Sequence, residues 1–185
     1  MARTRGFSDS WLSRRPGTMA RHELATERTQ PLTFAHHLHG FACGAISLDE
    51  WLKRRVLTNQ ASGASRTFVV ADQEGRVFCY YAIAAGDVSN LMATSSVRRN
   101  MPDSVPVMVL ARLAIDHRAQ GIKLGAGMLQ VVVNRAVTVS HSVGVRALLV
   151  HAFNERAKEY YEHYGFQESP QHTMTLMQRL NTDKA

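Results

Sequence analysis

Apolar side chains return at helical spacing in the first well-patterned stretch of the chain, at Leu48, Trp51, Leu52 and Val56. Ser47 stands just before this pattern and Glu50 follows three residues later, which is the spacing of a capping box. The Ser47 hydroxyl would accept a hydrogen bond from a free backbone N–H group of the first turn. The pattern therefore predicts a capped helix that begins at Ser47.

The middle of the chain has the pattern of strands. Arg66–Ala71 and Arg76–Ala84 are rich in β-branched and aromatic residues, and the polar turn Asp72–Gly75 separates them. This arrangement predicts a β-hairpin. Gly86–Ser104 indicates a long connection, and Val105–Ile115 is a long apolar run of strand type.

Helices and strands alternate in the second half. We expect a helix over about Ile122–Val139, a short apolar strand over Val145–Val150 and a second helix over Asn154–Tyr164. Gln167–Ser169 and Thr173–Gln178 have the pattern of final strands. Strands that alternate with helices favour an α/β sheet with crossover connections.

Composition narrows the class of protein. The chain has 185 residues, of which 45% are hydrophobic and 20% charged, as in a single folded domain. No stretch approaches the ~18 apolar residues of a membrane span. Cys43 and Cys79 lie far apart, which argues against a disulfide framework and fits a reducing cytoplasm. The formal net charge of +7 is compatible with a nucleic-acid partner, with a phosphorylated cofactor, or with an effect on solubility alone.

The charge is unevenly distributed along the chain. Residues 1–30 hold six arginines against three acidic residues, and we expect this segment to be a disordered basic extension, with Met19 as an alternative start. The predicted organisation is one domain over residues 31–180 and a short tail over residues 181–185.

The richest chemistry follows the apolar strand that ends at Ile115. A turn with Gly121 leads into a helix whose first turn carries Gly125 and Ala126. The first N–H groups of a helix lack internal partners and carry partial positive charge, so such a turn can bind phosphate oxygens. Neither a Walker loop nor a G-x-G-x-x-G dinucleotide motif is present in the sequence.

The last predicted helix carries a group of tyrosines. Asn154 is a suitable N-cap, and Gly165 is placed to end the helix. Tyr160, Tyr161 and Tyr164 share one face. Packing in the core accounts for Tyr160 and Tyr164, and Tyr161 alone is a candidate for chemistry once the two motifs are considered together.

The two motifs together resemble the GNAT family of N-acetyltransferases. They are Gln120-x-x-x-x-Gly125, after the strand Leu113-Ala114-Ile115, and Asn154-x-x-Ala157-x-x-x-Tyr161-x-x-x-Gly165-Phe166. Three further stretches resemble the toxin branch of that family, which belongs to bacterial toxin–antitoxin modules. They are Phe41-x-Cys43-Gly44-x-x-x-Leu48-Asp49-x-Trp51-Leu52, the pair Tyr80-Tyr81, and Pro106-Val107-x-x-Leu110-Ala111-Arg112-Leu113-Ala114-Ile115-Asp116. The resemblance covers residues 32–180.

The resemblance implies an α/β (α+β) GNAT fold, with a mixed, mostly antiparallel twisted sheet of six or seven strands and about four flanking helices. It also implies a set of acetyl-CoA-binding residues and no metal. That set is Leu113, Ala114, Ile115, Gln120, Gly121, Ile122, Lys123, Leu124, Gly125, Ala126 and Asn154. Tyr161 would be the catalytic residue beside the thioester sulfur. Lys123 departs from the family pattern, which has glycine at this position.

In the toxin branch the implied substrate is aminoacyl-tRNA, whose α-amino group is acetylated so that translation stops. Arg98 and Arg99, in the long connection, are the candidate contacts to tRNA. The resemblance further implies a cytoplasmic bacterial homodimer with a ribbon-helix-helix antitoxin partner.

Other readings of the residues stay open. The acceptor could be a small amine or a protein N-terminus, or the chain could be a non-catalytic acyl-CoA-binding or nucleic-acid-binding module. His36-His37-x-His39 has no acidic or cysteine ligand at suitable spacing, so it does not predict a metal site. His151 could line the active cleft or serve a structural role.

Overall fold

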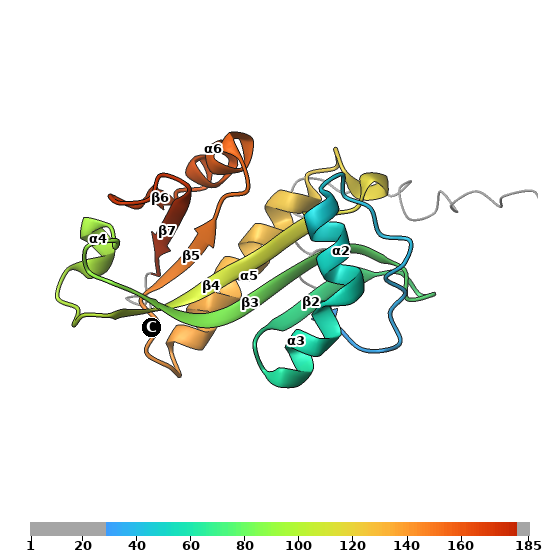
Figure 1. Ribbon diagram of the computed structural model, residues 1–185, viewed down its shortest axis with the longest axis horizontal. Coiled ribbons are helices and arrows are strands. Elements are labelled where there is room, and N and C mark those ends of the chain that lie inside the picture. The colour runs from blue at the N-terminus through green and yellow to red at the C-terminus, as the bar shows by residue number, and fades with distance from the viewer. Residues whose placement is uncertain (1–28, 181–185) are drawn as a thin grey trace, which may run out of the picture.

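A computed structural model of the protein describes residues 29–180 (Figure 1). Within this range the chain forms seven strands, five α-helices and one 3-10 turn. In chain order they are β1 (Thr29–Pro31), α2 (Ile46–Arg54), α3 (Val56–Ser62), β2 (Arg66–Ala71), β3 (Val77–Val88), α4 (Ser95–Arg98), β4 (Val105–Ile115), η1 (His117–Ala119), α5 (Leu124–Ser140), β5 (Ala147–His151), α6 (Glu155–His163), β6 (Gln167–Glu168) and β7 (Thr175–Arg179). Most of the expected N-terminal extension and the whole C-terminal tail lie outside the described residues. Strand β1 starts at Thr29, two residues before the predicted start of the domain at residue 31.

All seven strands form one sheet in the order β1-β2-β3-β4-β5-β7-β6. Every neighbouring pair is antiparallel except β4 and β5, which run parallel. The predicted mixed, mostly antiparallel sheet of six or seven strands is therefore confirmed. None of the helices in the described range is long and apolar enough to cross a membrane.

Side chains alternate between the two faces of the sheet, and each face has its own helices (Figure 1). Tyr81 and Leu110 point to the face covered by α5 and α6, where they join the largest apolar cluster. Tyr80 points to the opposite face and packs against α2 and α3. A third cluster, around Val97 of α4, covers the end of the sheet where β4 begins.

The central strand β4 pairs with its two neighbouring strands over different numbers of residues. It pairs with β3 from Val105 to Ile115, but with β5 only from Val107 to Leu110. The register against β3 shifts after Leu110, so that Ala111 is an extra residue and forms a β-bulge. Beyond the bulge, residues 111–115 have no strand partner on the β5 side within the described part of the chain.

The capping box predicted for Ser47 is wrong. Helix α2 starts one residue earlier, Ala45 is its N-cap, and no side chain caps it there. Asp49, in the first turn of α2, instead accepts a 2.9 Å hydrogen bond from the backbone N–H of Cys43. The backbone upstream of the helix is therefore held by an acidic side chain inside the helix.

Other predicted elements agree with the structure to within a few residues. The bounds predicted for β4 are confirmed, and so is the hairpin of β2 and β3. The segment predicted as a connection is shorter than expected, because β3 continues to Val88 and α4 forms within the remainder.

Candidate active site

The end of β4 forms one wall of the site. Ala114 is buried, while Leu113 and Ile115 are half-buried. The segment is held by β3, where Leu113 pairs with Tyr81 and Ile115 with Cys79. Its other edge leaves backbone N–H and C=O groups that an extended ligand could pair with, as an added strand would.

The turn after β4 aims the start of α5 at this wall. Gly121 has a φ of 80°, and Lys123 has a φ of 60° as the N-cap of α5. Both are left-handed, a conformation that favours glycine over any residue with a Cβ. The left-handed backbone at Lys123 would suit the glycine that the resemblance expects at this position. The predicted helix start at Ile122 is two residues early for the same reason.

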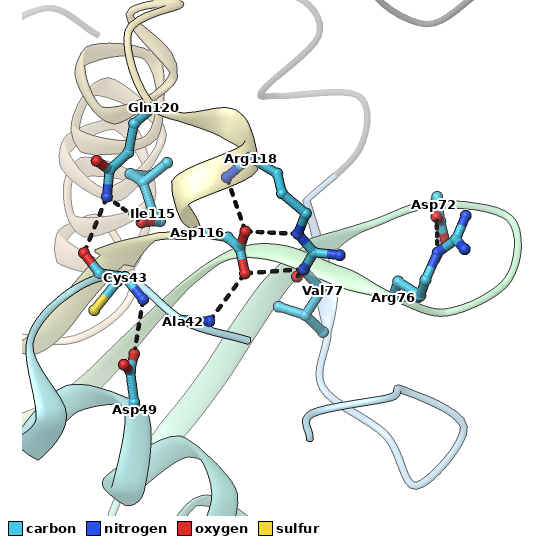
Figure 2. A network of polar contacts seen from close by, with 10 residues as sticks. All are labelled: Ala42, Cys43, Asp49, Asp72, Arg76, Val77, Ile115, Asp116, Arg118 and Gln120. Carbon is cyan, nitrogen blue, oxygen red and sulfur yellow. Dashed lines mark hydrogen bonds and ion pairs between the residues drawn. The ribbon is translucent and has the colours of Figure 1, made fainter. Parts of the chain in front are cut away.

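A buried carboxylate holds the turn in place (Figure 2). Asp116 is 1% exposed and accepts four hydrogen bonds. The backbone N–H of Ala42 donates at 3.0 Å, and the backbone N–H, Nε and Nη2 of Arg118 donate at 2.9, 2.7 and 2.9 Å. Burial alone would raise the pKa of Asp116, but these donors outweigh burial and lower the pKa below its usual value.

Gln120 completes this connection between the turn and the N-terminal part of the chain. Its amide nitrogen lies 3.0 Å from both the Cys43 carbonyl and the Ile115 carbonyl, and donates to them (Figure 2). The side chain predicted to bind the cofactor therefore joins β4 to the segment before α2. Asp116 and Arg118 had no predicted role, although Asp116 ended the motif that carried the resemblance.

Helix α6 forms the other side of the site, and both of its predicted ends are confirmed. The Asn154 side chain accepts a 2.9 Å hydrogen bond from the Ala157 N–H as the N-cap. Gly165, with a φ of 88°, follows the last helical residues. In the first turn of α5, a Cβ placed on Gly125 would lie 3.4 Å from the Tyr160 hydroxyl, so this side chain of α6 reaches the start of α5.

The three tyrosines of α6 lie in different surroundings. Tyr161 is 9% exposed, and its ring centroid lies 5.5 Å from that of Phe166. Burial raises the pKa of Tyr161 to about 12, so its phenol is protonated at neutral pH. Tyr160 is half-buried and packs against the same apolar cluster. Core packing is wrong for Tyr164, which is 39% exposed at the end of the helix.

Neither cysteine is suited to act as a nucleophile. Burial, followed by the neighbouring Asp49, raises the pKa of Cys43 to about 11, and burial raises the pKa of Cys79 well above its usual value. Both thiols therefore stay protonated at neutral pH, and the thiolate is the nucleophilic form. An acyl group would have to pass directly to its acceptor rather than through a cysteine.

The basic candidates lie elsewhere. Arg98 and Arg99 are exposed at the end of α4, which packs over the beginning of β4, whereas the turn described above follows the end of that strand. His151 lies at the end of β5 with its Nδ1 3.0 Å from the Thr175 hydroxyl. In the described range, no three His, Cys, Asp or Glu side chains gather as a metal site would require.

Comparisons with known proteins agree with this geometry. The family model described as "Acetyltransferase (GNAT) family" matches residues 32–166. The chain is 42% identical over 151 residues to a "tRNA-acetylating toxin" of Mycobacterium tuberculosis (strain ATCC 25618 / H37Rv), a match that covers 82% of this chain and 90% of that protein.

Two solved structures share the fold and about a quarter of the sequence. The structure of AtaT complexed with acetyl-methionyl-tRNAfMet is 25% identical, with a TM-score of 0.76 over 82% of this chain and 93% of that one. The structure of AtaTR bound with AcCoA is also 25% identical, with a TM-score of 0.73 over 82% and 92%.

We predict that Asp116→Asn destabilises the protein by about 2–4 kcal/mol at pH 7, because an amide offers one acceptor oxygen where the carboxylate offers two to its donors. The matched control is Asp72→Asn, which weakens the more exposed pair with Arg76 (Figure 2) and should cost about 1 kcal/mol or less. Chemical denaturation of the three proteins provides the measurement.

The stability difference between wild type and Asp116→Asn should depend on pH. Since the pKa of folded Asp116 lies below the unfolded value of about 3.9, its contribution is present above that pH and disappears as pH falls through the folded pKa. The difference between wild type and Asp116→Asn should therefore shrink below about pH 4. Equal stability of the two proteins at pH 7 would exclude Asp116 as the support of the turn.

Proposed function

The chain belongs to the acetyltransferase (GNAT) family, and on that premise we propose that it is a toxin that moves acetyl from acetyl-CoA to the α-amino group of aminoacyl-tRNA and so blocks translation. The observation that carries the proposal is the half-paired end of β4, which faces the start of α5 and the Tyr161 helix. The relative named as a tRNA-acetylating toxin supports the choice of acceptor.

The residues around β4 fit an acyl-CoA molecule. Leu113, Ala114 and Ile115, on the edge without a strand partner, offer backbone groups to the pantetheine arm, except for the Ile115 carbonyl, which accepts from Gln120. The free N–H groups at the start of α5 suit the pyrophosphate, and the glycines at 121 and 125 keep side chains away from it. The residues proposed around the pyrophosphate are Gly121, Ile122, Lys123, Leu124, Gly125 and Ala126, with Asn154 near the arm.

Lys123 adds a feature that the family pattern lacks. Its ammonium group stands on the residue that precedes α5, where the helix already attracts anions. A cation at that position would strengthen the interaction with a phosphate group. Because the backbone accommodates Lys123 in the left-handed conformation, the substitution changes the charge of the turn and keeps its shape.

The chemistry requires a neutral amine, a polarised carbonyl and a proton for the departing sulfur. Acetyl-CoA supplies the activated acetyl thioester. An α-amino group with a pKa of about 8 is partly neutral near pH 7, so the protein need not provide a strong base. A backbone N–H of the Leu113–Ile115 segment would stabilise the oxyanion, and the Tyr161 phenol holds the proton for the sulfur.

The remaining features of the proposal concern partners. Arg98 and Arg99 are proposed to contact tRNA phosphates, away from the reacting groups. The toxin branch further suggests a cytoplasmic homodimer and a ribbon-helix-helix antitoxin. From its composition alone, and outside the resemblance, residues 1–30 are proposed to be a basic extension ahead of one catalytic domain.

The function is tested by incubating the protein with labelled acetyl-CoA and a pool of charged tRNAs, and then identifying the labelled species. We expect label on the amino acid of one or more aminoacyl-tRNAs. Label on a small amine or a protein N-terminus instead would support the alternative acceptor. Binding of acetyl-CoA with no transfer to any acceptor would support a non-catalytic module.

We predict that Tyr161→Phe lowers kcat by about 10²–10⁴-fold, because the departing sulfur loses its proton donor. Thermal unfolding should change little, since the buried ring is retained. The kcat/KM of the wild type should rise with pH through the amine pKa of about 8 and show no fall up to about pH 10, because the Tyr161 proton is lost only near its pKa of about 12.

The assay is acetylation of a single purified aminoacyl-tRNA at saturating acetyl-CoA. Tyr164→Phe is the matched control, because it removes an exposed hydroxyl from the same helix and should leave the rate unchanged. An unchanged kcat in Tyr161→Phe would remove this residue from the mechanism.

A further inference from the structure

The residue next to the proposed catalytic tyrosine carries an unexplained hydroxyl. The Tyr160 phenol oxygen is buried, and no atom in the described part of the chain is within hydrogen-bond reach of it. It faces the first turn of α5, where a Cβ on Gly125 would lie 3.4 Å from the oxygen and 3.8 Å from the Ile115 side chain. The hydroxyl therefore lies near the end of β4 and the start of α5.

Packing explains the ring of Tyr160 but not its oxygen. The ring centroid lies 5.5 Å from that of Tyr161 in an edge-to-face contact, and 5.0 Å from that of Tyr164. Phenylalanine would make the same ring contacts. A buried hydroxyl without a partner costs free energy, so the tyrosine is less stable here than phenylalanine would be.

A buried polar group without a partner is rare in a folded protein, and a functional role is one explanation for it. Burial, the largest cause, raises the pKa of Tyr160 well above its usual value. The phenol is therefore neutral and able to donate a hydrogen bond. Gly125 keeps a side chain away from this hydroxyl, because a methyl group on that residue would lie against one side of it.

We propose that the Tyr160 hydroxyl donates a hydrogen bond to a pyrophosphate oxygen of the bound acyl-CoA, as a cofactor-binding residue distinct from Tyr161. The inference rests on the proposed function only in that an acyl-CoA binds at the end of β4. A neutral donor to an anionic oxygen forms a stronger bond than a donor to a neutral acceptor. Binding would thus give a partner to a buried polar atom that the fold leaves without one.

The decisive variant is Tyr160→Phe, studied without and with coenzyme A. In the absence of ligand its Tm should rise by about 2–4 °C, because the unpaired hydroxyl is gone. In titration calorimetry its Kd for coenzyme A should increase about tenfold. At saturating acetyl-CoA its kcat should stay within about twofold of wild type, while the KM for acetyl-CoA increases with the Kd.

Tyr164→Phe is the matched control, since it removes an exposed hydroxyl from the same helix and should change neither Tm nor Kd. Dephospho-coenzyme A, which keeps the pyrophosphate and lacks the ribose phosphate, should show the same tenfold loss with Tyr160→Phe. A loss confined to full coenzyme A would assign the hydroxyl to the ribose phosphate and overturn the proposal.

Two further results distinguish this inference from the proposed function. If wild type and Tyr160→Phe bind coenzyme A equally well, Tyr160 has only a structural role and the inference fails, although the acetyltransferase proposal stands. If wild type does not bind coenzyme A, the acetyltransferase proposal itself fails. A lower Tm for unliganded Tyr160→Phe would show that the hydroxyl has a stabilising partner, and would also overturn the inference.

Discussion

The site depends on the separation of two parallel strands in the middle of the sheet. β4 and β5 pair through Leu110, and the bulge at Ala111 then turns β4 away while β3 continues to hold it. β5 ends at His151, one residue after its last pair with β4, so the end of β4 has no strand partner on that side. Backbone groups are therefore left open on a strand that β3 holds in place, and a ligand can pair with them without first ordering a loop.

The second constraint is the long-range connection from the N-terminal segment to the turn after β4. Asp116 joins Ala42 to Arg118, Gln120 joins Cys43 to Ile115, and Asp49 holds Cys43 from inside α2 (Figure 2). Helix α2 on one face of the sheet and the turn after β4 are therefore fixed to the same few backbone groups.

Local sequence patterns were sufficient to predict most helices and strands, but they did not predict the contacts between them. The bounds of β4, the Asn154 cap and the Gly165 stop depend on residues close in sequence, and all three were predictable. The predicted capping box paired Ser47 with Glu50. The structure instead uses the Asp49 carboxylate, which binds the backbone N–H of Cys43 upstream of the helix. The hydrogen bonds from Gln120 to Cys43 and from Ala42 to Asp116 join residues more than 70 positions apart, so local sequence patterns could not predict them.

Amide hydrogen exchange across β4 tests the central claim most directly. If the end of β4 receives the pantetheine arm as an added strand, acetyl-CoA should slow exchange in residues 111–115, while residues 107–110, already paired with β5, change little. A matched loss of exchange at the start of α5 should accompany it. Tight binding of acetyl-CoA with unchanged exchange in residues 111–115 would contradict the account and move the cofactor to another surface.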